Sequence, residues 1–485
     1  MLLLAGCAAR GAVRPLAPEV ALLPAELDSV FADPAFARAS WGVVVQSLDD
    51  GQVLYRRNAE RLFLPASNLK ILTAAAALVR LGADFRYRTA VLARGTRRAD
   101  TLAGDLVVAG RGDPTLVLDT ARGAADPLVT LRPWADSLKA RGIRVVLGRV
   151  VGGATPFTDP PLGPGWAWDD LDAEYSAPVG ALQFNESVAY LIAVPGQAPG
   201  EPVRLSLLPR SAPLRVFATA TTAVRDSGAA ALRWSRAPFT DSVTVSGSLA
   251  VGRDTVRLPL SVPDPARYFA TSLTEALAGR GLAVAGESVA VVALAPDTLF
   301  VWTSPPLSAV LPPFLKPSQN QIGETLLRTL GAEGAGVGSM DSGRAVVGRV
   351  LSDFGVPPDA YVLADGSGLS RYDYVAPEAI AQVLFAMYAR PDFRTFYDAL
   401  PIAGVDGTLA TRLRGTAAAG NAHAKTGSLT GVRALSGYVE TADGEHLLFV
   451  LLANNFTAPQ RLVEAAQDLI VERLANFSRR TAAGR

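Results

Sequence analysis

Ser67 and Lys70 stand three residues apart in Ser67-Asn68-Leu69-Lys70, where a long apolar run begins. In a helix such a pair shares one face, with its Cβ atoms about 5 to 6 Å apart. A serine that attacks an acyl carbon needs a base, and a lysine can be that base only while it is neutral. Burial and the positive end of a helix dipole both favour the neutral amine. The pair is therefore a candidate nucleophile and base.

Lysine is scarce in this chain, and each lysine is therefore informative. Only four of the 46 basic residues are lysines, at positions 70, 139, 316 and 425. All the other basic residues are arginines, so a lysine that merely supplied charge could have been an arginine too. Arginine stays protonated and cannot act as a base. A serine three residues before a lysine still arises by chance in roughly one such chain in four, so a surface pair is the alternative interpretation.

Two further stretches carry groups that suit the same chemistry. Lys425-Thr426-Gly427-Ser428 places a cation and two hydroxyls before an expected strand, where they could bind a carboxylate. Gly427 would let a substrate backbone approach closely, and an exposed N–H group there could stabilise an oxyanion. Ser318-Gln319-Asn320 precedes an expected helix. Taken alone, the first stretch could be a turn and the second an ordinary helix cap.

In this order, Ser-x-x-Lys, Ser-x-Asn and Lys-Thr-Gly match the three active-site motifs of the penicillin-recognising serine enzymes, which include penicillin-binding proteins and serine β-lactamases. The long separation between Ser67 and Ser318 resembles the class C low-molecular-mass penicillin-binding proteins, the D-Ala-D-Ala carboxypeptidase/endopeptidase family called peptidase S13. The similarity runs from about Leu27 to Phe477 and includes the stretches 110–116, 365–371 and 404–409. Gln319 departs from the family, which often has Asp at this variable position.

The resemblance implies a serine-type D-Ala-D-Ala carboxypeptidase or endopeptidase that acts on peptidoglycan stem peptides without metal or organic cofactor. In it, Ser67 attacks the carbonyl between the two terminal D-alanines, and Lys70 takes its proton. Ser318 relays a proton between the lysines and the leaving amine, and Asn320 binds the acyl side of the substrate. Penicillin would remain on the enzyme as a slowly hydrolysed acyl group.

The resemblance also implies how the substrate's carbonyl and carboxylate are held. Backbone N–H groups of Ser67 and Ser428 are the expected oxyanion hole. The loop from Asp365 to Arg371 is expected to shape the floor of the site, without a catalytic role. The residues expected to bind substrate at the third motif are Lys425, Thr426, Gly427 and Ser428, with the terminal carboxylate held by Lys425, Thr426 and Ser428.

Three other functions fit the sequence less well. A β-lactamase or esterase would use the same Ser67, but no glutamate suited to rapid deacylation can be identified, and the long insertion disfavours it. A non-catalytic, lipid-anchored cell-wall scaffold would not need the complete set of motif residues. A Ser-His-Asp hydrolase is disfavoured because His423 is interpreted as a strand-edge residue, and His446 as a structural residue inside an apolar strand.

The motifs must be positioned by one sheet and its helices. Trp41–Leu48 and Gln52–Arg56 read as strands joined by an Asp-Gly turn. The apolar run Leu69–Leu81 follows Pro65 and predicts a buried helix that starts near Ala66 and holds Ser67 in its first turn. Other expected helices lie at 266–280, 322–330, 344–354 and 377–388; strands at 432–440 and 445–453 and a helix at about 459–475 would complete the first sheet.

The expected fold class is α/β (α+β), with a β-lactamase/transpeptidase-like three-layer domain of helices around an antiparallel sheet, plus inserted β-rich domains. A chain of 485 residues is long enough for two or more domains. We expect a signal and tether at 1–24, a discontinuous penicillin-binding domain at 25–90 and 264–478, a β-rich insertion of two subdomains at 91–263, and a tail at 479–485.

The single cysteine bears on location. Cys7 lies in Leu4-Ala5-Gly6-Cys7, which resembles a bacterial lipobox, although the apolar stretch before it is short and lacks a basic start. We expect a periplasmic or extracytoplasmic protein whose membrane contact is at most a lipid on Cys7. A net charge of +1 and the absence of basic runs with aromatics disfavour nucleic acid as a partner. Two histidines and one cysteine disfavour a metal site.

Overall fold

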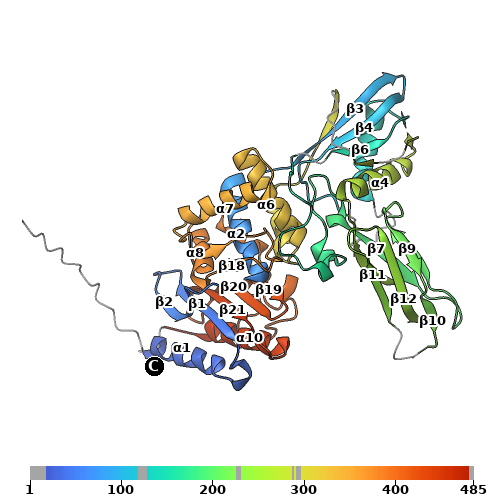
Figure 1. The fold of residues 1–485 in the computed structure, drawn as a ribbon. Helices are drawn as coiled ribbons and strands as arrows, with labels where there is room; N and C mark the ends of the chain where they lie inside the picture. Colours follow the sequence, from blue (N-terminus) through green and yellow to red (C-terminus); the bar gives the residue numbers. More distant parts are fainter. Residues whose placement is uncertain are drawn as a thin grey trace, which may run out of the picture.

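The computed structural model describes residues 18–117, 128–153, 156–225, 231–286, 289–290 and 297–479. Its central element is a five-stranded antiparallel sheet in the order β19-β20-β21-β1-β2, in which the last strands of the chain pair with the first (Figure 1). The two expected late strands, β20 and β21, complete the sheet, and β19 adds a third late strand that was not expected. The strands are β1 (Ser40–Ser47), β2 (Val53–Arg57), β19 (His423–Leu429), β20 (Val432–Glu440) and β21 (His446–Asn454).

Helices cover both faces of this sheet, which makes a three-layer domain (Figure 1). In β21, Leu447, Phe449 and Leu451 belong to one apolar core, whereas the alternating Leu448, Val450 and Leu452 belong to the other. This alternation explains why the strand is apolar throughout. The first core contains α1 (Pro18–Phe31) and α10 (Gln460–Asn476); the second contains α2 (Leu69–Leu81), α5 (Leu307–Leu315), α6 (Asn320–Ala335), α7 (Met340–Asp353), α8 (Pro377–Tyr388) and α9 (Phe393–Ala399).

A β-rich insertion lies beside this domain and has its own core (Figure 1). One sheet contains β3 (Arg88–Arg98), β4 (Thr101–Ala109), β5 (Val145–Val146), β6 (Val150–Gly153), β14 (Ala283–Val284), β15 (Val289–Ala290) and β16 (Asp297–Thr303), with α3 (Arg132–Ala140) and α4 (Pro265–Ala278). The other two sheets contain β7 (Val188–Val194), β8 (Arg204–Leu208) and β13 (Val256–Ser261), and β9 (Arg215–Ala218), β10 (Thr221–Ala223), β11 (Leu232–Arg236) and β12 (Ser242–Ala250).

The insertion extends further along the chain than the expected range 91–263. Helix α4 buries Tyr268 and Phe269 in the core of the insertion, and β16 pairs with β3 in its largest sheet. The chain therefore re-enters the three-layer domain after β16, not at residue 264 as expected. Apolar periodicity identified α4 as a helix, but periodicity does not show which core a helix joins.

The amino-terminal boundary also differs from the expectation of a tether up to residue 24. Helix α1 begins at Pro18, and its Leu23, Leu27 and Phe31 are buried in the core shared with α10. Cys7 and residues 480–485 lie outside the described residues. Within the described residues, none of the helices has both the length and the apolar character needed to cross a bilayer.

Candidate active site

Ser67 lies at the entrance to α2, on the short 3₁₀ turn η2 (Ala66–Asn68) that precedes the helix. Ala66, immediately before it, has a left-handed φ of 46°. One turn later, Lys70 Nζ lies 2.9 Å from Ser67 Oγ. The helix expected from the apolar run therefore brings the candidate nucleophile and base into direct hydrogen-bond contact.

Lys70 is fully buried, and three oxygens surround its amine. Nζ lies 2.9 Å from Ser67 Oγ, 2.6 Å from Asn320 Oδ1 and 2.7 Å from the Ser367 carbonyl oxygen. An ammonium would donate to all three, whereas a neutral amine has two hydrogens and one lone pair. When neutral, it can donate to Asn320 and Ser367 and turn its lone pair towards the Ser67 hydroxyl. The amine is thus arranged to accept the serine proton.

Burial lowers the pKa of Lys70 to about 7, although the carboxyl groups of Asp365, Glu324 and Asp373 act in the opposite direction. Desolvation is the largest cause because it penalises the charged ammonium. The pKa of Glu324 is itself raised to about 7 by burial, and burial also raises that of Asp373. A substantial fraction of Lys70 is therefore neutral near pH 7.

The loop from Asp365 to Arg371 holds the Ser367 carbonyl beneath Lys70. The Asp365 carboxylate accepts hydrogen bonds from backbone N–H groups of Ser367, Gly368 and Ser370 at 2.7 to 3.0 Å. Gly368 has a φ of +80°, and a Cβ there would lie 1.9 Å from the Ala66 carbonyl oxygen. Only glycine therefore lets this loop reach the turn that carries Ser67. The loop lies under the site as expected.

The third motif forms most of β19, the edge strand of the central sheet. Thr426 and Ser428 line the pocket beside Ser67, and Thr426 Oγ1 lies 2.7 Å from Thr408 Oγ1. Lys425 is fully buried, and its Nζ donates to the Thr426 carbonyl at 3.0 Å. Burial, with a smaller contribution from Lys70, holds the pKa of Lys425 well below its ordinary value.

Gly427 lies where β19 passes the turn that carries Ser67. A Cβ at this position would lie 2.8 Å from the Pro65 carbonyl oxygen and 3.2 Å from Ala66 Cβ. The structure therefore gives Gly427 a packing role, whereas the sequence suggested close approach of a substrate. Asn68 also joins the two segments, because its Nδ2 donates to the Lys425 carbonyl at 2.8 Å.

The second motif lies at the start of α6. Ser318 lines the pocket and has a left-handed φ of 66°. Gln319 caps α6 by accepting from the Gln321 N–H at 3.0 Å. Asn320 is bound on both sides, because Oδ1 accepts from Lys70 and Nδ2 donates to the Tyr175 carbonyl at 2.7 Å.

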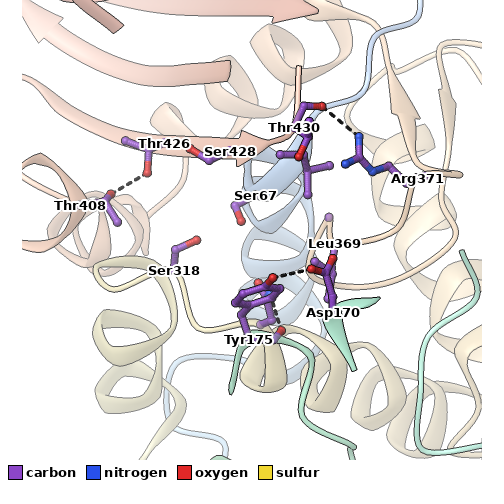
Figure 2. Close-up of a pocket in the computed structure, with 13 residues that line it drawn as sticks. Ser67, Asp170, Tyr175, Ser318, Leu369, Arg371, Thr408, Thr426, Ser428 and Thr430 are labelled. Atoms are coloured by element: carbon purple, nitrogen blue, oxygen red, sulfur yellow. Dashed lines mark hydrogen bonds between the residues drawn. The ribbon is translucent and has the colours of Figure 1, made fainter. Parts of the chain in front are cut away.

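The three motifs meet around one pocket of about 310 Å³ (Figure 2). The hydroxyl groups of Ser67 and Ser318 point into it in Figure 2. Sequence reasoning did not identify several of its other lining residues. Asp170 and Tyr175 come from the insertion, Thr408 from the short 3₁₀ turn Gly407–Leu409, and Thr430 from the turn between β19 and β20. Arg371, which also lines the pocket, donates from Nη1 to the Thr430 carbonyl at 3.1 Å. The pocket therefore presents hydroxyl groups, one carboxylate and one guanidinium to a ligand.

Neither histidine lines this pocket. His423 is buried at the start of β19, where its ring stacks on Tyr397 with centroids 3.8 Å apart. His446 was expected to be structural inside a strand, but it is exposed at the first position of β21, with Nδ1 3.4 Å from Asp49 Oδ1. Among the described residues, no group of three His, Cys, Asp or Glu side chains could hold a metal ion.

Comparison with solved structures shows the class of protein. The fold is similar to that of penicillin binding protein 4 from Haemophilus influenzae, with a TM-score of 0.79 and 28% identity over 93% of this chain and 99% of that one. A second structure of the same protein, in complex with a β-lactam, gives a TM-score of 0.74 and 26% identity, with the same coverage. The chain thus has the mixed helix and sheet fold of β-lactamase/transpeptidase-like enzymes.

Residues 23–477 match the D-Ala-D-Ala carboxypeptidase 3 (S13) family, and the chain belongs to this family. It is 36% identical to the D-alanyl-D-alanine carboxypeptidase of Actinomadura sp. (strain R39), over 93% of this chain and 84% of that protein. It is 30% identical to the D-alanyl-D-alanine carboxypeptidase DacB of Haemophilus influenzae, over 86% of this chain and 85% of the relative. The protein is therefore a peptidase hydrolase of the D-Ala-D-Ala carboxypeptidase type.

Proposed function

We propose that the protein cleaves the bond between the two terminal D-alanines of peptidoglycan stem peptides through an acyl-enzyme on Ser67. The observation that carries this proposal is the environment of Lys70. Its buried amine contacts Ser67 Oγ at 2.9 Å, and two carbonyl oxygens can accept its hydrogens. A lysine held in this way is a base ready for the serine proton.

The reaction follows from this arrangement. Lys70 takes the Ser67 proton as Oγ bonds to the substrate carbonyl carbon, and backbone N–H groups of Ser67 and Ser428 stabilise the resulting oxyanion. Ser318 relays the proton that Lys70 took from Ser67 to the leaving amine, and D-alanine departs as the C–N bond breaks. Asn320 binds the acyl side of the substrate. Water then attacks the ester and releases the shortened peptide with Ser67 regenerated.

The terminal carboxylate of the substrate would lie against β19. Thr426 and Ser428 offer hydroxyl groups to it, and the buried Lys425 amine, which donates to the Thr426 carbonyl, would supply the nearby charge. A bound carboxylate nearby favours the charged ammonium, so substrate binding would raise the pKa of Lys425 towards its ordinary value. Gly427 keeps the strand close to Ser67, so that carboxylate and scissile carbonyl can be held together.

The same chemistry supports binding of β-lactam antibiotics, whose amide carbonyl would acylate Ser67. One solved structure of similar fold is a penicillin binding protein in complex with a β-lactam. Peptidoglycan lies outside the cytoplasmic membrane, which implies a periplasmic or otherwise extracytoplasmic location. A lipid on Cys7 would anchor the protein there.

Release of D-alanine tests the proposed function directly. We expect wild-type protein to liberate D-alanine from an acylated peptide ending in D-Ala-D-Ala, and Ser67→Ala to liberate none. A peptide ending in L-Ala-L-Ala is the matched substrate control. Equal release by wild type and Ser67→Ala, with both proteins folded, would contradict the assignment of Ser67.

A further inference from the structure

The turn Asn185-Glu186-Ser187 of the insertion has an unusual backbone. All three residues have left-handed φ values, of 47°, 56° and 57°. None of them is glycine, and side chains disfavour this conformation unless surrounding contacts impose it. The turn leads directly into β7. Contacts with other parts of the molecule must therefore hold the turn in this shape.

These contacts are made with the second motif. Gln319 Nε2 donates to Glu186 Oε2, and Gln321 Nε2 donates to Ser187 Oγ at 3.1 Å. The adjoining segment of the insertion accepts from the residue between them, because Asn320 Nδ2 lies 2.7 Å from the Tyr175 carbonyl oxygen. Three successive residues that follow Ser318 are therefore bound by the insertion.

The direction of the Gln319 bond is fixed. Its Oε1 accepts the Gln321 N–H at 3.0 Å to cap α6, so its Nε2 must face Glu186. Burial raises the pKa of Glu186, whereas the hydrogen bond from Gln319 acts to lower it. On β7, the Tyr190 phenol also lies close enough to interact with the Glu186 carboxyl. An acidic side chain at 319 could still cap α6, but when ionised it could not donate to Glu186.

Contacts hold the chain on both sides of Ser318. On its amino-terminal side, Lys316 Nζ is 2.6 Å from Asp406 Oδ2. On its other side, Gln319 is held by Glu186. The left-handed φ of Ser318, 66°, directs its hydroxyl into the pocket (Figure 2). A conformation of this kind persists only when neighbouring contacts determine it.

We propose that Glu186 and Ser187 are positioning residues for the reaction, which hold Gln319 and Gln321 so that Ser318 and Asn320 face Ser67 and Lys70. The inference rests on the proposed roles of Ser318 and Asn320. It assigns the insertion a direct part in building the active site.

The experiment is a double-mutant cycle on Glu186 and Gln319, read as the rate constant for acylation by benzylpenicillin at pH 8. Gln319→Asp removes the donor and sets two carboxylates against each other. We expect it to slow acylation by about tenfold or more, since small misplacements at a site are costly. Glu186→Gln, which keeps an acceptor, should stay within about threefold of wild type. The double variant restores a donor and an acceptor in reversed order, and should return to within about threefold of wild type.

Glu201→Gln is the matched control, because Glu201 accepts from the Gln197 N–H at 2.7 Å in another loop of the insertion. It should acylate like wild type. A Gln319→Asp rate within threefold of wild type, or a double variant as slow as Gln319→Asp, would overturn the inference. If Gln319→Asp does not fold, Glu186→Ala replaces it: acylation slower than in Glu186→Gln supports the inference, and equal rates refute it.

Ser318→Ala and Asn320→Ala separate this inference from the proposed function. If either acylates at the wild-type rate, the proposed role of that residue fails, whatever the cycle shows. If both are slow and the cycle shows no coupling between 186 and 319, only the positioning by the insertion fails.

Discussion

Acidification should slow acylation of Ser67 with a midpoint near pH 7. The acting form of Lys70 is the neutral amine, and its pKa is lowered from 10.5 to about 7 by burial. The rate therefore rises with pH through the folded-state pKa and reaches a plateau above it. At pH 5 only about 1% of a base with this pKa is neutral, so acylation should be about 100-fold slower than on the plateau.

The size of the effect shows what burial contributes. With an ordinary pKa of 10.5, about one lysine in 3,000 would be neutral at pH 7, whereas about half is neutral when the pKa is 7. The gain in reactive base is on the order of 10³-fold, equivalent to about 5 kcal/mol between the two protonation states. The assay is the rate of adduct formation with benzylpenicillin from pH 5 to 9. A flat profile, or a midpoint near 10, would refute the reasoning.

Glu324 must be distinguished from Lys70, because burial raises its pKa into the same range, to about 7. Glu324→Gln cannot titrate, and it removes a carboxylate that raises the pKa of Lys70. The fall in acylation rate on acidification should therefore persist in this variant, with its midpoint at lower pH. If the fall disappears, it belongs to Glu324 and not to Lys70. Arg328 is buried and its Nη1 lies 3.1 Å from Glu324 Oε2, so Glu324→Gln alone leaves the Arg328 charge buried without its partner. The double variant Glu324→Gln/Arg328→Met removes both charges and avoids this problem.

Three other outcomes follow from the site. Gly427→Ala would place Cβ 2.8 Å from the Pro65 carbonyl oxygen, so urea unfolding should show a loss of about 1–3 kcal/mol, and an unchanged midpoint would contradict the packing argument. Lys316→Met removes the 2.6 Å contact with Asp406 and should cost about 2 kcal/mol in the same assay, with slower acylation; full stability would show that the pair is dispensable. Dialysis against EDTA should leave D-alanine release unchanged, and a loss that a divalent ion restores would reveal a metal requirement.

Local patterns in the sequence predicted those parts of the fold that depend on neighbouring residues. The apolar run Leu69–Leu81 predicted α2, although the helix was expected to start near Ala66 and begins at Leu69 after a short 3₁₀ turn; Pro377–Tyr388 predicted α8 with the same bounds. The motif residues are recognisable because their chemistry requires particular residue types at fixed spacing. Ser67 and Lys70 are adjacent in space because one helix turn joins them.

Other features depend on contacts between distant segments and could not be predicted in this way. Strand β19 contains buried His423 and Lys425 and lacks the run of branched apolar residues that indicates a strand. The carbonyl of Ser367 binds Lys70 through its backbone, which leaves no signal in residue type. Tyr175 meets Asn320 across a separation of 145 residues, and no local pattern records that contact.

The segment around α1 was expected to be part of a tether up to residue 24, because it is rich in Ala and Pro. Pro24 lies inside the helix, yet Leu23, Leu27 and Phe31 are buried against the sheet and α10. Burial of an apolar face stabilises a helix even where local propensity is poor. The boundary of the insertion was misplaced because α4 could have packed on either core.

The most direct test of the account is intact-protein mass spectrometry after incubation with benzylpenicillin, followed over hours for wild type and Ser67→Ala. We expect an adduct of one penicillin on wild type that persists for hours, and none on Ser67→Ala. Rapid loss of the wild-type adduct with drug hydrolysis would instead indicate a β-lactamase. An adduct on folded Ser67→Ala, or no adduct on either protein, would contradict the claim that Ser67 is the nucleophile of a penicillin-binding peptidase.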